Sequence, residues 1–282
     1  MDAAAIKNQK RHFQFLKARI VALVLVAGSA SVVTPAWLNL PKAVLIATLL
    51  FFVVVFNAIA WHQRYDRRWF SCRAVAESIK VITWRFMMKA TPYHDTVTST
   101  IGSQFAKDVL QCLDDQPEVK QEVVSVPTEG TQVSQYMLEL RKQSLDKRKE
   151  TYLKDRIQDQ RGWYRNKGLK NKNSGNNWFY ATFSLQVLSA IIALILIAFP
   201  NSPVNPVGVV TTLATSGLSW TTARSHQELS QSYGIVSQEL AALEDRAREV
   251  TTDQELEELV LEVERTISRE HTIWRVRRLV GP

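Results

Sequence analysis

The run WFYATFSLQVLSAIIALILIAF, from Trp178 to Phe199, decides the fold class because its 22 residues include no charged side chain. A helix needs about 20 predominantly apolar residues to cross the hydrocarbon core of a bilayer. A second run, VLIATLLFFVVVFNAIAW from Val44 to Trp61, is of the same kind. The mean hydropathy of -0.12 hides these runs, because highly charged stretches lie beside them. The two runs predict a membrane protein built from helices.

Each of these runs has an apolar neighbour across a short break. IVALVLVAGSASVVTPAWL precedes Val44, and the hydroxyl-rich VGVVTTLATSGLSWTTA follows Phe199 beyond the segment PNSPVNP. We therefore predict an all-α membrane protein with four transmembrane helices arranged as two hairpins. The four predicted spans cover residues 20–38, 43–61, 178–199 and 207–223.

The first span has an alternative interpretation. Lys17 and Arg19 before a short apolar run that ends in AGSAS also fit a signal peptide cleaved after Ala30. The apolar character resumes as far as Trp37, and a second span follows at once. The uncleaved hairpin is the better interpretation.

Basic side chains indicate the orientation of the spans. Lys and Arg cluster before the first span, after the second, before the third and after the fourth, whereas the two loops within the hairpins share one Lys. Because loops rich in Lys and Arg stay in the cytoplasm, we expect a multi-pass protein of the bacterial inner membrane with both termini cytoplasmic. The same flanks account for the net charge of +8, so no nucleic-acid partner is expected.

No sequence motif points to catalysis. The chain has no glycine-rich phosphate loop, no nucleophile elbow and no HExxH motif, and its five His lack ligand spacing. Cys72 and Cys112 form no CxxC pair. We expect neither an enzyme nor a cofactor or metal site, although distant residues could still assemble a composite site.

The segments between the hairpins read as long cytoplasmic helices. After Trp61 an apolar period of three or four residues continues without a breaker until Pro92, which predicts one helix running out of the membrane. The polar segment 116–132 is the best candidate for a loop, and another helix begins near Ser134. The segment GLKNKNSGNN, residues 168–177, predicts a helix break or a cap at the lipid headgroups.

The C-terminal region carries the clearest soluble pattern. Apolar residues recur at helical spacing from Leu229 to Ala247 and again from Leu256 to Trp274, on either side of Thr251-Thr252-Asp253. This pattern predicts a C-terminal helical hairpin over residues 224–282, and its apolar stripe is typical of a core or an oligomer seam rather than a ligand groove.

Two sequence strings resemble a known family. YLKDRIQDQRGWYRNK (152–167), before the second hairpin, closely resembles the SLATT domain, and AESIKVITWRFMMKATPY (76–93), after the first, resembles another SLATT subtype. The chain looks like tandem SLATT domains, the first over residues 1–148 and the second over 149–282. The resemblance implies a pore-forming or membrane-disrupting effector of a prokaryotic anti-phage system, acting by abortive infection and triggered by a nucleotide second messenger or a neighbouring-gene sensor protein.

The hydroxyl-rich span contains a polar stripe. On a helical wheel of about 100° per residue, seven small or hydroxylated side chains fall within about 140° of one another. These pore-lining candidates are Gly208, Thr211, Thr212, Thr215, Ser216, Ser219 and Thr222. Copies assembled as a homo-oligomer could surround water with this stripe, and a lumen without a ring of charges is expected to select weakly among ions.

The stripe also has a purely structural interpretation. Gly208, Thr212 and Ser216 form a ladder of small residues that would let two helices pack closely. The chain would then be a membrane-anchored oligomerisation scaffold that holds a sensor or enzyme at the membrane. A secondary transporter is disfavoured, because the two repeats are parallel and the spans contain no buried ionisable residue.

Overall fold

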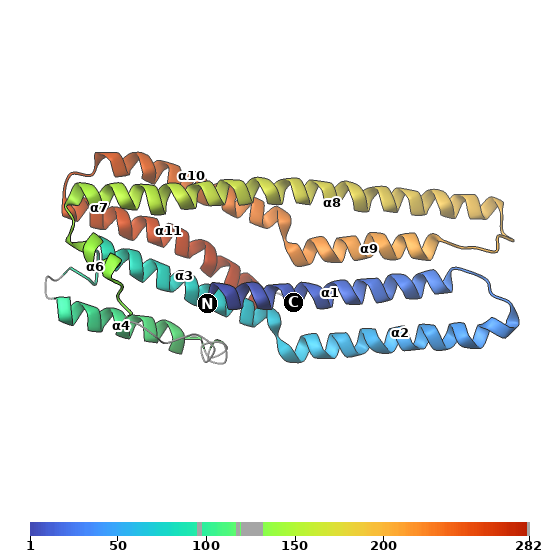
Figure 1. Ribbon diagram of the computed structural model, residues 1–282. Coiled ribbons are helices and arrows are strands. Elements are labelled where there is room, and N and C mark those ends of the chain that lie inside the picture. The colour runs from blue at the N-terminus through green and yellow to red at the C-terminus, as the bar shows by residue number, and fades with distance from the viewer. Residues whose placement is uncertain (95–97, 117–118, 120–131, 281–282) are drawn as a thin grey trace. The chain divides into compact units, whose positions relative to one another are not determined.

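The computed structural model describes residues 1–94, 98–116, 119 and 132–280, without the side chains of 98–99 and 270–280 (Figure 1). Helices account for almost all of this chain, and β-structure within it is limited to one bridge between Val32 and Val204. The prediction of an all-α protein is therefore confirmed. Most of the predicted loop at 116–132 and the side chain of Trp274 lie outside the described residues.

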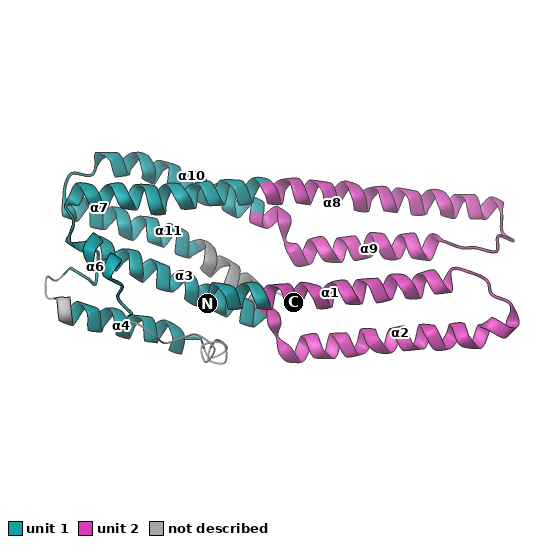
Figure 2. Ribbon diagram, in the orientation of Figure 1, with its two compact units in different colours: residues 1–7, 67–169, 230–282 teal, residues 8–66, 170–229 magenta. Residues whose placement is uncertain are grey.

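The chain divides into two compact units, each built from both halves of the sequence (Figure 2). Unit 1 comprises residues 1–7, 67–169 and 230–282, and unit 2 comprises residues 8–66 and 170–229. The sequence suggested a division near residue 148, between two consecutive domains. The spatial division differs, because the long apolar segments of both halves gather in unit 2 and their more polar segments gather in unit 1.

Unit 2 contains most of four long helices. These are α1 (Asp2–Ala30), α2 (Ala36–Gln63), α8 (Asp159–Ala198) and α9 (Val207–Arg224). By length and hydropathy, three described helical stretches could cross a membrane: Asp2–Ala30, Ala36–Met88 and Leu145–Ala198. Helix α9 is not among them, since its many hydroxyl groups lower its mean hydropathy, so the fourth span stays a prediction.

Helix α9 packs between α8 and α1 within unit 2. Its hydroxyl Thr211 shares a hydrogen bond of 2.8 Å with Ser189 of α8. On its other side, the Trp220 ring lies 5.5 Å from the ring of Phe13 in α1. The connecting segments also meet, because the Asn205 amide donates to the Ser31 carbonyl over 2.9 Å. Helices α1 and α9 are therefore antiparallel neighbours.

Two predicted helix boundaries near the first hairpin are wrong. The first span was placed at 20–38, but α1 ends at Ala30 and α2 begins at Ala36, directly after Pro35. Pro35 favours this position because a helix can start after its fixed φ. The second helix was expected to continue to Pro92, but α2 ends at Gln63, where Arg64 adopts a left-handed φ of 44°. A new helix, α3, follows over Tyr65–Met88.

The break predicted within residues 168–177 is also wrong, because α8 runs through this segment without interruption. Its glycines allow close approach instead. A Cβ at Gly168 would lie 3.6 Å from the Ser230 carbonyl oxygen in unit 1, and one at Gly175 would lie 3.5 Å from the His226 Cβ in unit 2. Tertiary packing of this kind overrides a low intrinsic helix propensity.

Unit 1 consists of helices around an apolar core that also contains buried charged side chains. Besides parts of α1, α3 and α8, its elements are α4 (Thr98–Asp114), α6 (Gln135–Lys142), α7 (Leu145–Tyr152), the π-helical turn η2 (Leu153–Gln158), α10 (His226–Glu249) and α11 (Asp253–Val280). A capping box starts α11: the Thr252 hydroxyl accepts from the Glu255 amide, and the Glu255 carboxylate accepts from the Thr252 amide.

The apolar stripe of α10 and α11 forms the core of unit 1. Its described members are almost all buried, and Leu240, Val263 and Ile267 are completely so. The interpretation of this stripe as core is confirmed. Since a single chain already covers these side chains, the stripe is not free to act as a seam between copies.

Candidate functional site

The hydroxyl-rich face of α9 borders a groove of about 270 Å³ within unit 2. Helix α9 contributes Thr212, Thr215, Ser216 and Ser219 to its lining. Helix α1 contributes Arg19, Ile20, Leu23, Val26 and Ala27. One wall is therefore hydroxylated and the other largely apolar, with a guanidinium among its side chains.

The structure separates the seven pore-lining candidates into two groups. Four of them line the groove, as given above, and Ser216 among these is 9% exposed. The remaining three, Gly208, Thr211 and Thr222, lie outside the lining, and all three are exposed. Thr211 bonds to Ser189 of α8, so its hydroxyl serves the contact between these helices. The predicted stripe therefore combines a groove wall with a packing contact.

Most hydroxyls of α9 are satisfied by their own helix. Thr212 donates to the Gly208 carbonyl over 2.7 Å, and Ser219 donates to the Thr215 carbonyl over 3.0 Å. Thr215 donates to the carbonyls of Thr211 and Thr212. These local bonds leave the hydroxyl oxygens facing the groove with acceptor capacity. Such a wall is polar without any need for a partner helix.

A close contact between α8 and α9 occurs at Gly217, which is not among the seven pore-lining candidates. A Cβ at Gly217 would overlap the Thr182 methyl group, whereas one at Gly208 would meet nothing within 4 Å. Gly208, the first residue of the predicted ladder, therefore makes no close helix contact within a single chain. The sequence signal that could have identified Gly217 was the spacing of two small residues, Ala214 and Gly217, on one face of the helix. The structure buries Ala214 as well.

A basic cluster surrounds one end of the groove, and sequence reasoning treated its members only as membrane flanks. Arg19 donates to the Asn57 side-chain oxygen of α2 over 3.2 Å. The Arg224 guanidinium carbon lies 4.9 Å, and the Lys17 ammonium 5.6 Å, from the centroid of the Trp220 ring. Cation–π contacts of this kind hold positive charge in a fixed place.

In unit 1, the sequence strings that carry the family resemblance build a buried polar core. Arg156 forms two hydrogen bonds with Glu264, of 2.9 and 2.6 Å, and both side chains are buried. The Tyr152 hydroxyl donates to the same carboxylate over 3.0 Å. From the first half of the chain, the Trp84 ring packs 5.4 Å from the Tyr152 ring. The contact of Trp84 with Tyr152 therefore joins the two halves of the chain, and the pair of Arg156 with Glu264 joins η2 to α11 within the second half.

Two further buried arginines bind backbone carbonyls near the end of α3, and one of them also reaches the second half of the chain. Arg141 donates to the carbonyls of Phe86 and Tyr93, each over 2.6 Å. Arg148 donates to the Met88 carbonyl over 3.0 Å and also pairs with Asp253. These two side chains therefore fix the conformation of the turn after α3, which precedes them in sequence by 48 to 60 residues.

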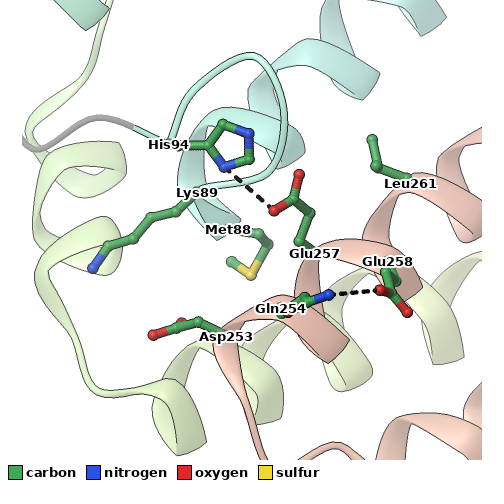
Figure 3. Close-up of a pocket in the computed structure, with 8 residues that line it drawn as sticks. All are labelled: Met88, Lys89, His94, Asp253, Gln254, Glu257, Glu258 and Leu261. Carbon is green, nitrogen blue, oxygen red and sulfur yellow. Dashed lines mark hydrogen bonds and ion pairs between the residues drawn. The ribbon is translucent and has the colours of Figure 1, made fainter.

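A second cavity, of about 690 Å³, lies in unit 1 between the end of α3 and the first turns of α11 (Figure 3). Asp253, Glu257 and Glu258 place three carboxylates on its wall. His94 and Glu257 point toward one another, with 3.3 Å between Nδ1 and the carboxylate (Figure 3). Desolvation, followed by the nearby Arg148, lowers the pKa of Lys89 on the opposite rim.

The chemistry of this acidic cavity disfavours a phosphate ligand. Its carboxylates occupy the N-terminal turns of α11, where a helix dipole otherwise favours anions. They already have partners, because Thr91 donates to Glu257 and Gln254 donates to Glu258. A nucleotide would bring negative charge against three carboxylates. The cavity fits a structural role or a cationic group better.

Comparison with known families assigns both halves of the sequence. Residues 1–149 match the SMODS and SLOG-associating 2TM effector domain 3, and residues 152–274 match the SMODS and SLOG-associating 2TM effector domain 1. The search of curated proteins and the search of solved structures found no match. Together with the long apolar helices, these matches indicate a membrane-associated effector. The chain belongs to the SLATT family and carries two SLATT domains in tandem.

Proposed function

We propose that this effector permeabilises the membrane, with the groove between α1 and α9 as part of the path. The observation that carries this proposal is a hydroxylated groove within a unit whose other surfaces are strongly apolar. Polar side chains inside a membrane are costly unless they face protein or water. An open groove wall of hydroxyls supports contact with water better than contact with lipid tails.

The proposal includes a location and a topology. Unit 2 lies in the bacterial inner membrane with four spans, and both termini and unit 1 lie in the cytoplasm. The basic flanks of the hairpins and the three strongly apolar helical stretches support this arrangement. Several copies assemble as a homo-oligomer, which brings more than one groove together.

The proposal also includes a trigger. A nucleotide second messenger does not suit the acidic cavity of unit 1, as its carboxylates repel phosphate. We therefore favour activation by a partner sensor protein that touches unit 1. The effector then acts in prokaryotic anti-phage defence, by abortive infection, without catalysis.

One observation favours the second candidate function, a membrane-anchored scaffold. The contact of Gly217 with Thr182 and the bond between Ser189 and Thr211 are typical of helices that associate through small and polar residues. A membrane anchor requires only that its transmembrane helices associate in this way. The two functions differ in whether the membrane becomes permeable.

Leakage from liposomes distinguishes the two functions. We expect full-length protein in phosphatidylethanolamine–phosphatidylglycerol liposomes to release ions or a small entrapped dye, while protein-free liposomes stay sealed. Changing Thr215 and Ser219 together to Leu should strongly reduce leakage without loss of assembly, because apolar constrictions exclude water. The matched control changes Leu213 and Leu218 to Ala and should leave the leakage unchanged. No leakage, combined with no toxicity on expression, would favour the anchor.

A further inference from the structure

The groove carries a charge that the sequence assigned to a flank. Arg19 is the one charged side chain in the lining among the described residues, and it lies on the wall opposite Thr215 and Ser219. Its guanidinium donates to the neutral amide of Asn57. Within unit 2, no described carboxylate pairs with it. The hydrogen bond therefore positions the positive charge of Arg19 without cancelling it.

Unit 2 as a whole is strongly positive. It contains nine Lys and Arg and two acidic residues, Asp66 and Glu228, whereas the whole chain carries a net charge of +8. The nine are Lys10, Arg11, Lys17, Arg19, Lys42, Arg64, Lys170, Lys172 and Arg224. Both acidic residues lie within four residues of where the chain leaves unit 2. Almost all of the excess positive charge of the protein thus belongs to the proposed membrane unit.

Three of these cations gather near one end of the groove. Lys17 and Arg224 both lie against the ring of Trp220, which directly follows the lining residue Ser219, and Arg19 is in the lining itself. The C-terminus of α9 offsets about half a positive charge through its helix dipole. That partial charge is small against three cations, so the end of the groove keeps a positive potential.

We propose that the groove selects small inorganic anions, with Arg19 as the residue that determines the selectivity. Rings of Arg and Lys produce anion preference in pores, and Arg19 with its basic neighbours Lys17 and Arg224 supplies positive charge at this groove. The inference rests on the proposed function, which supplies the permeability whose selectivity is at issue. An anion preference set by Arg19 differs from the weak ion selectivity that the sequence predicted for a lumen without charges.

The test is the reversal potential of full-length protein in a planar bilayer under a KCl gradient. We expect a reversal potential that is shifted from zero toward the equilibrium potential of chloride. Arg19→Gln should lower the chloride-to-potassium permeability ratio by roughly tenfold, and Arg19→Lys should preserve it. Lys10→Gln removes one positive charge from an exposed position outside the groove and should change the ratio much less.

A second variant keeps Arg19 in place and guards against misfolding of Arg19→Gln. Thr215→Glu puts a carboxylate on the opposite wall of the groove and should abolish or reverse the anion preference. A conductance that prefers cations, or has no preference, would overturn the inference and leave the proposed function standing. So would an anion preference unchanged in both Arg19→Gln and Thr215→Glu. A complete absence of conductance would instead count against the proposed function itself.

Discussion

In unit 1, charged side chains pair across helices inside the core, whereas in unit 2 the hydroxyls of α9 bond mainly to carbonyls of their own helix. Arg156 and Glu264 illustrate the first arrangement, with 108 residues between them in sequence. Thr215 illustrates the second, with its acceptors three and four residues away. A bond across helices is lost when the helices separate, but a bond within a helix survives.

This difference has a consequence for motion. Separating the helices of unit 1 would expose or orphan buried charges, at a cost of several kcal/mol for each broken pair. Separating α1 from α9 in unit 2 would break few polar contacts, since the hydroxyls that line the groove keep their intrahelical partners. The helices of unit 1 should therefore resist separation more strongly than α1 and α9 of unit 2. The following predictions test this contrast.

The largest expected effect follows from removal of a buried charge in unit 1. Glu264→Ala leaves the Arg156 guanidinium buried without its partner and should lower the free energy of unfolding by about 3–5 kcal/mol. Denaturant titration in mixed micelles measures this change. Arg246→Ala is the control, because its pair with Glu262 is about half exposed and should contribute less than about 1 kcal/mol. Equal losses in both variants would remove the basis of the contrast.

A smaller loss is expected from steric change in unit 2. Gly217→Leu places a side chain where the Thr182 methyl group already lies and should destabilise the contact of α8 with α9 by about 1–3 kcal/mol. Gly208→Ala adds a methyl group in open space and should be neutral or slightly stabilising. The midpoint of thermal unfolding in detergent compares the two. If only Gly208→Ala lowered the stability, the ladder of Gly208, Thr212 and Ser216 would be the face on which α9 packs.

Acid should affect unit 1 through Glu244. Desolvation raises the pKa of this buried carboxylate, but hydrogen bonds from Arg161 and Gln158 outweigh it and hold the pKa below its usual 4.5. The lowered pKa contributes stability above pH 4.5, and this stability is lost as pH falls from 4.5 through the folded-state pKa. The wild type should therefore lose more stability than Glu244→Gln when acidified over this window. If the stability of the two proteins fell in parallel with pH, the hydrogen bonds of Glu244 with Arg161 and Gln158 would contribute nothing to stability.

The smallest effect is expected from a groove hydroxyl. Thr215→Val removes a group bonded only to carbonyls of α9 and should change stability by less than about 0.5 kcal/mol. Thr211→Val also loses the bond to Ser189 of α8 and should cost about 1 kcal/mol. Thermal unfolding in detergent ranks the two variants. A larger loss for Thr215→Val would mean that its hydroxyl joins helices rather than lining water.

Local sequence properties determined the fold class and much of its core. A continuous apolar run of about 20 residues favours a transmembrane helix, because a helix satisfies its backbone polar groups within one segment. The apolar period of α10 and α11 identified side chains that are buried, such as Leu240 and Val263. Both properties depend on neighbours a few residues apart, so they can be read from the sequence directly.

Tertiary structure alone decided which helices meet and what each polar residue does. A helical period shows that α9 has a polar face but not that this face lies against α1, nearly 200 residues earlier in the chain. The same limitation hid the place of Arg19 in the groove lining, the close contact at Gly217 and the continuity of α8 through 168–177. Propensity and hydropathy describe single segments, whereas these features arise from packing between segments far apart in sequence.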